Sequence, residues 1–212
     1  MANNLFIDLF AGLGGASQAF IDRSGWTVVQ IDNNPDLLAY NHRLIMADVL
    51  DIEAVMAIID PLLHNVGHVV LWASPPCLEF SLAYSAPGPV AARAGVEFEP
   101  SLDCLNAAIA VRDWLTQRGV KLTWVIENVR GASPHFQPIL GAPRQIVASF
   151  FLWGNFTPLA FADRSVFKHT KTDIRHSPIR ANERAKVPWD VSQALFESVT
   201  VQRSLEAWLN QS

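Results

Sequence analysis

The chain has 212 residues, half of them hydrophobic and 17% charged, a composition that suits a globular protein with one good core and excludes a disordered chain. Its apolar runs fall far short of the roughly 18 residues that span a bilayer, and its start lacks the basic region of a signal peptide, so we expect a cytoplasmic protein with no membrane partner. Its two cysteines, Cys77 and Cys104, indicate neither a disulfide framework nor a metal site, and a net charge of −4 counts against a basic surface over the whole molecule.

Strand-like and helix-like segments alternate along the first 130 residues. Short apolar runs rich in β-branched residues predict strands at residues 5–9, 27–31, 44–47, 68–73 and 122–126. The segments between them predict helices at residues 16–23, 35–42, 51–63 and 101–118, with Asn34, Asp51 and Ser101 as caps. This alternation predicts an α/β fold with a doubly wound, mostly parallel, Rossmann-like sheet.

The remaining segments are less regular. Residues 84–100 and 130–143 are rich in glycine and proline, and we expect a mobile loop in the first and irregular structure in the second. Residues 150–153 read as a further strand and residues 191–209 as an amphipathic helix. We therefore expect a catalytic domain over residues 1–157, a basic segment over residues 158–188, and a C-terminal helix over residues 189–212 that packs back on a single compact domain.

Polar and glycine-rich residues follow several of the expected strands. The first strand leads into Asp-Leu-Phe-Ala-Gly-Leu-Gly-Gly at residues 8–15, where glycines allow the backbone to approach a ligand, although a tight turn explains them too. Asp32 ends the second strand, where a carboxylate commonly binds ribose hydroxyls. Asp48 follows the third strand and either accepts from an adenine amino group or caps the next helix. Ligands of such sheets bind at this edge.

Cys77 lies in the sharpest feature of the chain, Ser-Pro-Pro-Cys-Leu-Glu-Phe-Ser at residues 74–81. Two prolines hold the backbone extended before the cysteine, at the exit of the fourth strand. A rigid mount suits a nucleophile that must meet one atom of a substrate. A structural cysteine in a turn is the alternative, and Cys104, among apolar helical residues, reads as plain core.

Glu127 ends the fifth strand in Glu-Asn-Val-Arg, directly after an apolar run. Partial desolvation raises the pKa of a carboxyl group there, and a carboxyl group poised near neutrality can protonate a ring nitrogen. A surface ion pair or a helix cap explains Glu127 read alone. The sequence therefore predicts a thiol and a proton donor at neighbouring strand ends.

These segments, in this order and spacing, resemble the cytosine carbon-5 DNA methyltransferase family. The resemblance implies a fold of the S-adenosylmethionine-dependent methyltransferase type, a DNA substrate, and a target base flipped out of the duplex. It further implies that Cys77 adds to carbon 6 of cytosine, that Glu127 interacts with ring nitrogen 3 and the exocyclic amine, and that Asn128 braces the loop of Cys77. By the same matching, the residues that bind S-adenosyl-L-methionine are Phe10, Ala11, Gly12, Gly14, Gly15, Asp32, Asn33, Asp48, Val49 and Pro76.

The chain also departs from the family pattern. Only Arg144 stands where the family has several arginines after the Glu-Asn-Val strand, so the resemblance makes Arg144 the anion-stabilising candidate. The last family motif survives only as Val187-Pro188, without its Gly-Asn pair. A separate target-recognition domain is missing, as in compact versions associated with bacteriophage, which implies the cytosol of a bacterium or an infected host. The missing domain implies either reduced specificity or an accessory protein or oligomer that supplies part of the target recognition.

A basic segment stands where the family places its DNA-reading insert. It contains seven of the sixteen basic residues: Arg164, Lys168, Lys171, Arg175, Arg180, Arg184 and Lys186. We expect Lys168, Lys171 and Arg175 to contact DNA phosphates, and we expect Ser81 and Arg130 to bind DNA as well. A solvated loop explains the same charges.

Three other functions are open from the sequence. The first is methyl transfer to RNA cytosine or to a free cytosine nucleotide, which the missing recognition domain favours. The second is a catalytically inactive DNA-binding or cofactor-binding homologue, which the lost arginines favour and the intact Cys77 and Glu127 oppose. The third, a nicotinamide dehydrogenase, leaves the Pro-Cys and Glu-Asn-Val segments unexplained.

Overall fold

One seven-stranded sheet, in the order β3-β2-β1-β4-β5-β7-β6, organises the computed structural model, which describes residues 3–161 and 177–209. Its strands are β1 (Asn3–Leu9), β2 (Trp26–Asp32), β3 (Leu44–Met46), β4 (Val66–Ala73), β5 (Leu122–Asn128), β6 (Gln145–Val147) and β7 (Phe150–Gly154). The first five strands run parallel, whereas β7 is antiparallel to both of its neighbours. The expected doubly wound, mostly parallel sheet is confirmed.

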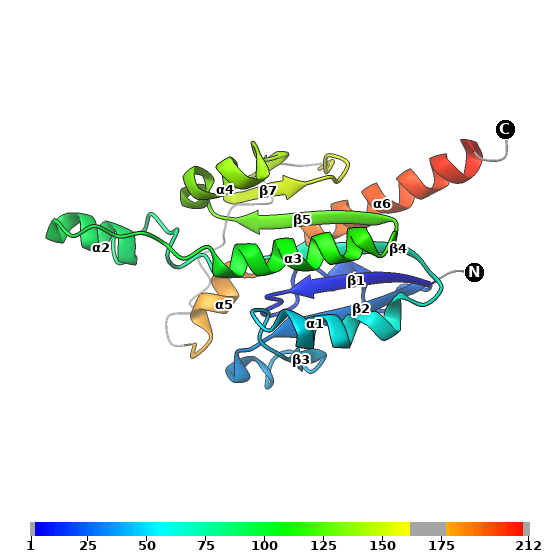
Figure 1. The fold of residues 1–212 in the computed structure, drawn as a ribbon, viewed down its shortest axis with the longest axis horizontal. Coiled ribbons are helices and arrows are strands. Elements are labelled where there is room, and N and C mark those ends of the chain that lie inside the picture. The colour runs from blue at the N-terminus through cyan, green and yellow to red at the C-terminus, as the bar shows by residue number, and fades with distance from the viewer. Residues whose placement is uncertain (1–2, 162–176, 210–212) are drawn as a thin grey trace.

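Helices cover both faces of this sheet (Figure 1). The α-helices are α1 (Ile52–Ile59), α2 (Pro87–Ala94), α3 (Asp103–Gln117), α4 (Ser133–Leu140), α5 (Arg180–Ala185) and α6 (Trp189–Leu209). The 3-10 helices are η1 (Gln18–Phe20), η2 (Pro35–Leu37), η3 (Asp60–Leu63) and η4 (Arg130–Ala132). Helices α1 and α3 lie on one face, and α6 with η1 on the other, so the central strands are buried from both sides.

Two apolar clusters result from this arrangement. On the face of α1 and α3, Leu71 of β4 and Ile126 of β5 pack with Val111 of α3. On the other face, Trp72 of β4 packs with Phe6 of β1 and Leu195 of α6. Because successive residues of a strand point to opposite faces, the continuous apolar runs of β1, β4 and β5 supply both clusters at once.

Two expected helices are shorter in the structure. Residues 16–23 form only η1, because Ser192 of α6 binds the local backbone: its hydroxyl donates to the carbonyl of Ala16 at 2.6 Å and accepts from the N–H of Ala19 at 2.9 Å. Residues 35–42 form only η2, capped as expected by Asn34, and the Asn41 side chain turns back to donate to the carbonyl of Gly12 at 3.1 Å. Contacts with residues outside the segment thus accompany the short helix in both cases, and only in the first do they take backbone hydrogen-bonding groups.

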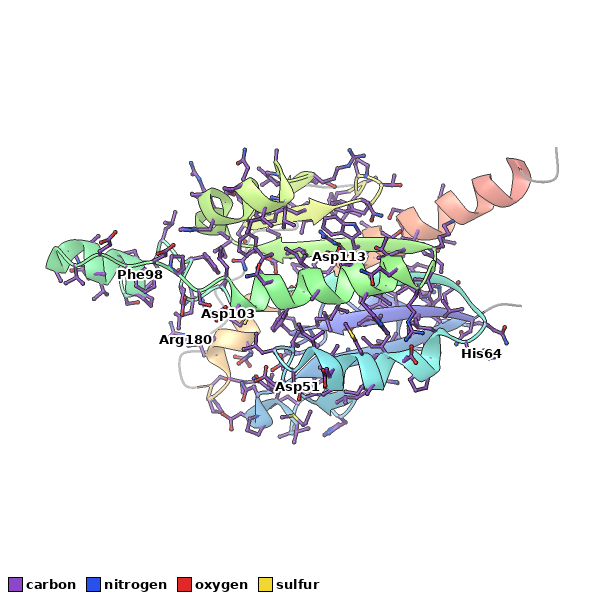
Figure 2. The ribbon with its side chains drawn as sticks, viewed as in Figure 1. Asp51, His64, Phe98, Asp103, Asp113 and Arg180 are labelled. Atoms are coloured by element: carbon purple, nitrogen blue, oxygen red, sulfur yellow. The ribbon has the colours of Figure 1, made fainter. Side chains whose placement is uncertain are left out.

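Two segments expected to be irregular form helices. Residues 84–100 contain α2, which begins at Pro87 and ends at Gly95 in the left-handed conformation, and α2 projects beyond the sheet edge with no buried residue (Figure 1). Phe98 lies on the same projecting arm (Figure 2). Residues 130–143 contain η4 and α4, and Phe136 of α4 enters the cluster on the α3 face. A proline in the first turn of α2 and of α4 favours the start of each helix at that point.

Short elements near the end of the chain were not predicted. Strand β6 has three residues and α5 has six, so neither shows a usable hydrophobic period. Helix α6 was predicted almost to the residue, and its first half packs on η1 through Val191 and Leu195. Among the helices of the described ranges, none combines the length and apolarity that crossing a membrane requires.

Candidate active site

The loops that follow β1, β2, β4 and β5 meet at the carboxyl edge of the parallel strands. Strands β1 and β4 pair Leu9 with Ala73, and strands β4 and β5 pair Ala73 with Ile126, so β1 and β4 end at one level and β5 continues two residues beyond it to Asn128. Cys77, Glu127 and the glycine loop of residues 10–15 therefore share this edge, as the sequence predicted from strand ends alone.

The loop that carries Cys77 is fastened to the end of β5. The Asn128 side-chain amide donates to the carbonyl of Pro75 at 2.9 Å, while its oxygen accepts from the backbone N–H of Val129 at 2.9 Å. Asn128 is 1% exposed, so neither contact competes with bulk water. Beyond the prolines, the N–H of Phe80 donates to the carbonyl of Cys77 at 3.1 Å, which closes a turn around the thiol.

Glu127 is a buried carboxyl group without a cationic partner among the described residues. Burial raises its pKa to about 7, and the hydrogen bond from the Ser74 hydroxyl opposes that rise. Burial also raises the pKa of the half-buried Cys77 thiol, and the negative charge of Glu127 raises it further. Protonation of Glu127 therefore makes the Cys77 thiolate easier to form.

The glycine loop after β1 turns sharply around Asp32. Phe10, Gly12 and Gly14 have φ values of 58°, 55° and 66°, a left-handed backbone that favours glycine. The carboxylate of Asp32 accepts from the backbone N–H of Gly12 and of Asn34, both at 2.9 Å. No atom lies within 4 Å of the point where a side chain at Gly12 would begin, so the loop borders open space.

The C-terminal segment presses directly on this loop. A Cβ atom at Gly15 would lie 2.4 Å from the backbone oxygen of Val187 and 2.8 Å from Cγ of Lys186, so only glycine fits there. The Val-Pro remnant of the last family motif thus lies beside the glycine loop, far from it in the sequence.

A second buried carboxyl group, Asp8, lies beneath the glycine loop. The Ser17 hydroxyl donates to it at 2.6 Å, and the Gln30 side-chain amide donates to that hydroxyl oxygen at 2.7 Å. Burial raises the pKa of Asp8 to about 7 in spite of the Ser17 hydrogen bond. Asp8 is closed off from solvent, so we assign it a structural place under the loop.

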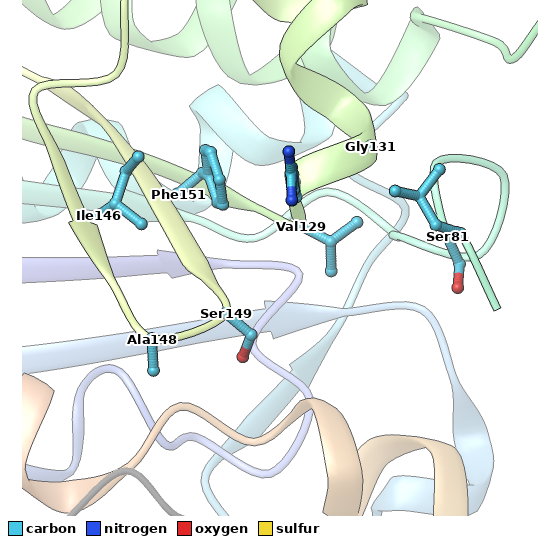
Figure 3. Close-up of a pocket in the computed structure, with 9 residues that line it drawn as sticks. Ser81, Val129, Gly131, Ile146, Ala148, Ser149 and Phe151 are labelled. Carbon is cyan, nitrogen blue, oxygen red and sulfur yellow. The ribbon is translucent and has the colours of Figure 1, made fainter. Parts of the chain in front are cut away.

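Two cavities border the Cys77 loop. The larger has a volume of about 710 Å³ and lies between the β6–β7 hairpin, with Ile146 and Ser149, and the loops that carry Ser81 and Arg130 (Figure 3). The smaller, about 190 Å³, is lined by residues that include Pro76 and Cys104. Cys104 was expected in the core, but it is only partly buried, because α3 begins beside this cavity and not beneath the sheet.

The remaining predicted residues divide into three groups. Ala11 and Val49 are buried, whereas Asn33 and Asp48 are exposed, and the Asp48 side chain accepts from the N–H of Leu50 at 3.0 Å. Arg144 is exposed and lines neither cavity, but it directly precedes Gln145, which pairs through Leu152 of β7 at the level of Glu127, so its role at the site stays a prediction. Lys168, Lys171 and Arg175 lie outside the described residues.

Sequence reasoning missed Trp72 and Ser74. The indole N–H of Trp72 donates to the Ser74 hydroxyl oxygen at 2.8 Å, and the pairing of Ala73 with Ile126 brings Ser74 level with Glu127. Both stand directly before the Pro-Pro-Cys segment, and the period of two along β4 was the signal that could have placed them on the same face as Glu127.

A mostly parallel sheet with a glycine loop after β1, a carboxylate after β2 and a thiol after β4 defines a Rossmann-like protein of the methyltransferase type. Residues 5–98 match the model of the C-5 cytosine-specific DNA methylases. These residues contain the glycine loop and Cys77, and the match confirms the resemblance to this family that the motifs predicted.

Other comparisons are remote. The methyltransferase EhMeth of Entamoeba histolytica has a TM-score of 0.39 to this structure and 15% sequence identity, over 76% of this chain and 55% of its own, so this chain spans about half the length of that protein. N5-carboxyaminoimidazole synthetase from Staphylococcus aureus has a TM-score of 0.22 and 16% identity, over 73% of this chain and 43% of its own. Neither likeness carries weight for function. No curated protein matches the sequence.

Proposed function

We propose that this protein transfers a methyl group from S-adenosyl-L-methionine to carbon 5 of cytosine in DNA, with Cys77 as the nucleophile. The observation that carries the proposal is the meeting of a mounted thiol with a buried carboxyl group whose pKa is about 7. A thiol and a proton donor at one edge are what addition to a cytosine ring requires.

The residues around the glycine loop fit the cofactor. The open space beside Gly12, the carboxylate of Asp32 and the cavity at Pro76 form a sequence of sites from an amino-acid end to an adenine end. In this assignment Phe10, Gly12 and Gly14 border the methionine part, Asp32 binds the ribose hydroxyls, and the smaller cavity near Asp48 takes the adenine. When bound, S-adenosylmethionine supplies an electrophilic methyl group.

The chemistry of the chain itself follows from the two coupled groups. Glu127 in its acid form donates to ring nitrogen 3, which draws electrons from carbon 6. The Cys77 thiolate adds to carbon 6, and the neutral state of Glu127 favours that thiolate because it removes a nearby negative charge. After methyl transfer, loss of the proton from carbon 5 allows Cys77 to leave. Asn128 keeps the thiol in place through Pro75.

The larger cavity suits a base that has left its duplex. Its lining combines apolar side chains, such as Phe151, with Ser81 and Arg130, which are two of the residues expected to bind DNA. We further propose that the basic segment of residues 158–188 contacts DNA phosphates, and that an accessory protein or a second copy completes target recognition.

One assay separates this function from the alternatives. The protein is incubated with a labelled methyl donor and, in parallel, with DNA, RNA or deoxycytidylate, and the modified base is identified. Label in 5-methylcytosine of DNA supports the proposal. Label only in RNA or only in the nucleotide would show that this molecule, and not DNA, is the substrate. Cofactor binding without any transfer would identify an inactive homologue.

A further inference from the structure

Three buried polar side chains lie directly beneath the glycine loop. The Ser17 hydroxyl donates to the Asp8 carboxylate at 2.6 Å, and the Gln30 side-chain amide donates to the Ser17 oxygen at 2.7 Å. All three residues are at most 1% exposed, so bulk water does not compete for these hydrogen bonds. A side chain at Gly14 would collide with the Gln30 amide, so the group is in contact with the loop itself.

The register of the strands places this group on the face of η1 and α6. Asp8 is paired with Gln30 of β2, so the two side chains stand side by side on the same face of the sheet. Phe6, two residues before Asp8, belongs to the apolar cluster of that face. Ser17 directly precedes η1 and reaches the group from the far end of the glycine loop. The three residues come from three segments and meet only in the folded protein.

The Ser17 hydroxyl has one hydrogen and two acceptors within reach. Besides Asp8 at 2.6 Å, the carbonyl oxygen of Gly14 lies 3.3 Å from the Ser17 oxygen. Because the Gln30 amide donates to this oxygen, the hydrogen of Ser17 points either to Asp8 or to Gly14. An ionised Asp8 takes the hydrogen, since a carboxylate accepts more strongly than a carbonyl. A protonated Asp8 can itself donate to Ser17, which frees the Ser17 hydrogen for Gly14.

We propose that Asp8 and Ser17 are positioning residues for the cofactor, because a proton on Asp8 switches the Ser17 hydroxyl from Asp8 to the Gly14 carbonyl and thereby fixes the glycine loop. The inference rests on the proposed function for the identity of the ligand that the loop binds. With Asp8 protonated, the Ser17 oxygen accepts from Asp8 and Gln30 and its hydrogen goes to Gly14, so every hydrogen-bonding position of the hydroxyl is used. The loop is then held in one arrangement before the cofactor arrives, which favours binding.

The carboxyl group of Asp8 changes its charge near neutral pH. Burial raises its pKa to about 7, the hydrogen bond from Ser17 opposes that rise, and the negative charge of Asp32 adds to it. Its neighbours in the sheet, Gln30 and Trp72, are uncharged, and no ion pair in the described part of the chain includes Asp8. Other charged residues of the surrounding elements are partly or fully exposed, namely Asp22 and Arg23 after η1, Lys186 before α6, and Asp190 and Glu197 on α6. Cofactor affinity is therefore expected to fall as pH rises through about 7 and Asp8 loses its proton.

Carbon-13 NMR of the cofactor-free protein tests the hydrogen-bond switch. The carbonyl carbon of Gly14 is expected to shift with pH at the same midpoint as the carboxyl carbon of Asp8, because its hydrogen bond from Ser17 forms when Asp8 is protonated. Ser17→Ala is expected to abolish the shift of the Gly14 carbonyl, while Asp8 still titrates at a higher midpoint. Asp8→Asn, whose amide also donates to Ser17, is expected to keep the carbonyl at its low-pH position. A Gly14 carbonyl that does not follow Asp8 in the folded protein overturns the inference.

Binding of S-adenosyl-L-homocysteine, whose sulfur carries no charge, tests the link to the cofactor. The measurements use the Glu127→Gln background, which removes the other carboxyl group with a pKa of about 7. Affinity is expected to fall roughly three- to ten-fold between about pH 5.5 and pH 8.5, the effect of one hydrogen bond. Calorimetry in two buffers of different ionisation enthalpy is expected to show proton uptake on binding near pH 7.

The variants at the two positions are expected to lose this proton linkage in opposite ways. Asp8→Asn is expected to bind with the low-pH affinity throughout, and Ser17→Ala with the high-pH affinity throughout, both without proton uptake. Proton uptake that persists in Asp8→Asn overturns the inference, and so does an affinity in the Glu127→Gln protein that does not vary with pH. If S-adenosylhomocysteine does not bind at any pH, the proposed function fails, whereas the Gly14 carbonyl still decides whether Asp8 controls the hydrogen bond.

Discussion

Two carboxylates at the same strand edge are held in opposite ways. Asp32, at the end of β2, is half-buried and accepts two backbone N–H groups at 2.9 Å. Glu127, at the end of β5, is buried and is contacted by one hydroxyl, and burial raises its pKa to about 7. The first arrangement suits a lasting acceptor for ligand hydroxyls, and the second suits a group that exchanges a proton near neutral pH. Binding and chemistry thus occupy different halves of one edge.

The largest effect is expected from substitution of Cys77, which distinguishes the residues of the chemical step from those of cofactor binding. Cys77→Ser is expected to abolish methyl transfer, because a hydroxyl is a far weaker nucleophile than a thiolate, while binding of S-adenosylhomocysteine stays near normal. Calorimetry measures the binding and labelled methyl transfer the activity. DNA that contains 5-fluorocytosine is expected to trap a covalent adduct with the original protein and none with Cys77→Ser. An active original protein that forms no adduct contradicts the cysteine mechanism.

Glu127→Gln tests whether the chemical half depends on a proton. The amide keeps the shape of the side chain but cannot exchange a proton, so turnover is expected to slow by about 100-fold or more, with a much smaller change in DNA affinity. Single-turnover rates and DNA titrations measure the two effects. Equal turnover in the two proteins would remove Glu127 from the site.

The same substitution is expected to stabilise the fold at alkaline pH. The pKa of Glu127 is raised above its ordinary value of 4.5, so the folded protein retains a proton that the unfolded chain releases, and stability falls as pH rises between about 4.5 and 7. Glu127→Gln removes this penalty, on the order of a few kcal/mol at pH 8, and has little effect at pH 4. Urea unfolding at both pH values checks the sign, and Asp8→Asn, at the other carboxyl group with a pKa of about 7, is expected to act alike. A lower stability of Glu127→Gln at pH 8 would contradict the raised pKa.

Asp32→Ala tests the binding half. Loss of a charge-assisted hydrogen bond is expected to weaken S-adenosylmethionine binding by roughly 1 to 3 kcal/mol. Calorimetry is expected to show a larger dissociation constant for the cofactor. Single-turnover rates at saturating cofactor are expected to change little. Unaltered affinity would show that the cofactor does not use this carboxylate.

The smallest effect is expected on the salt dependence of DNA affinity, from residues assigned neither to the cofactor nor to the chemical step. If Lys168, Lys171 and Arg175 each contact a phosphate, replacing all three with neutral residues is expected to flatten the slope of log affinity against log salt by roughly two to three. Cofactor affinity provides the control, because the cofactor residues lie at other strand ends. A salt slope equal to that of the original protein would assign the DNA to another surface.

The sequence by itself determined the five parallel strands, the strand-end positions of Asp32, Cys77 and Glu127, and the long helices α3 and α6. These features rest on local patterns, since a buried parallel strand reads as an apolar run and a ligand loop follows it directly. Only the tertiary structure decided the rest. Residues 16–23 stay out of a regular helix because Ser192 binds their backbone, and the hairpin of β6 and β7 adds two strands to the sheet beyond β5. The placement of Ser74 level with Glu127 depends on the register of β4 against β5, which is set by packing between elements distant in the chain.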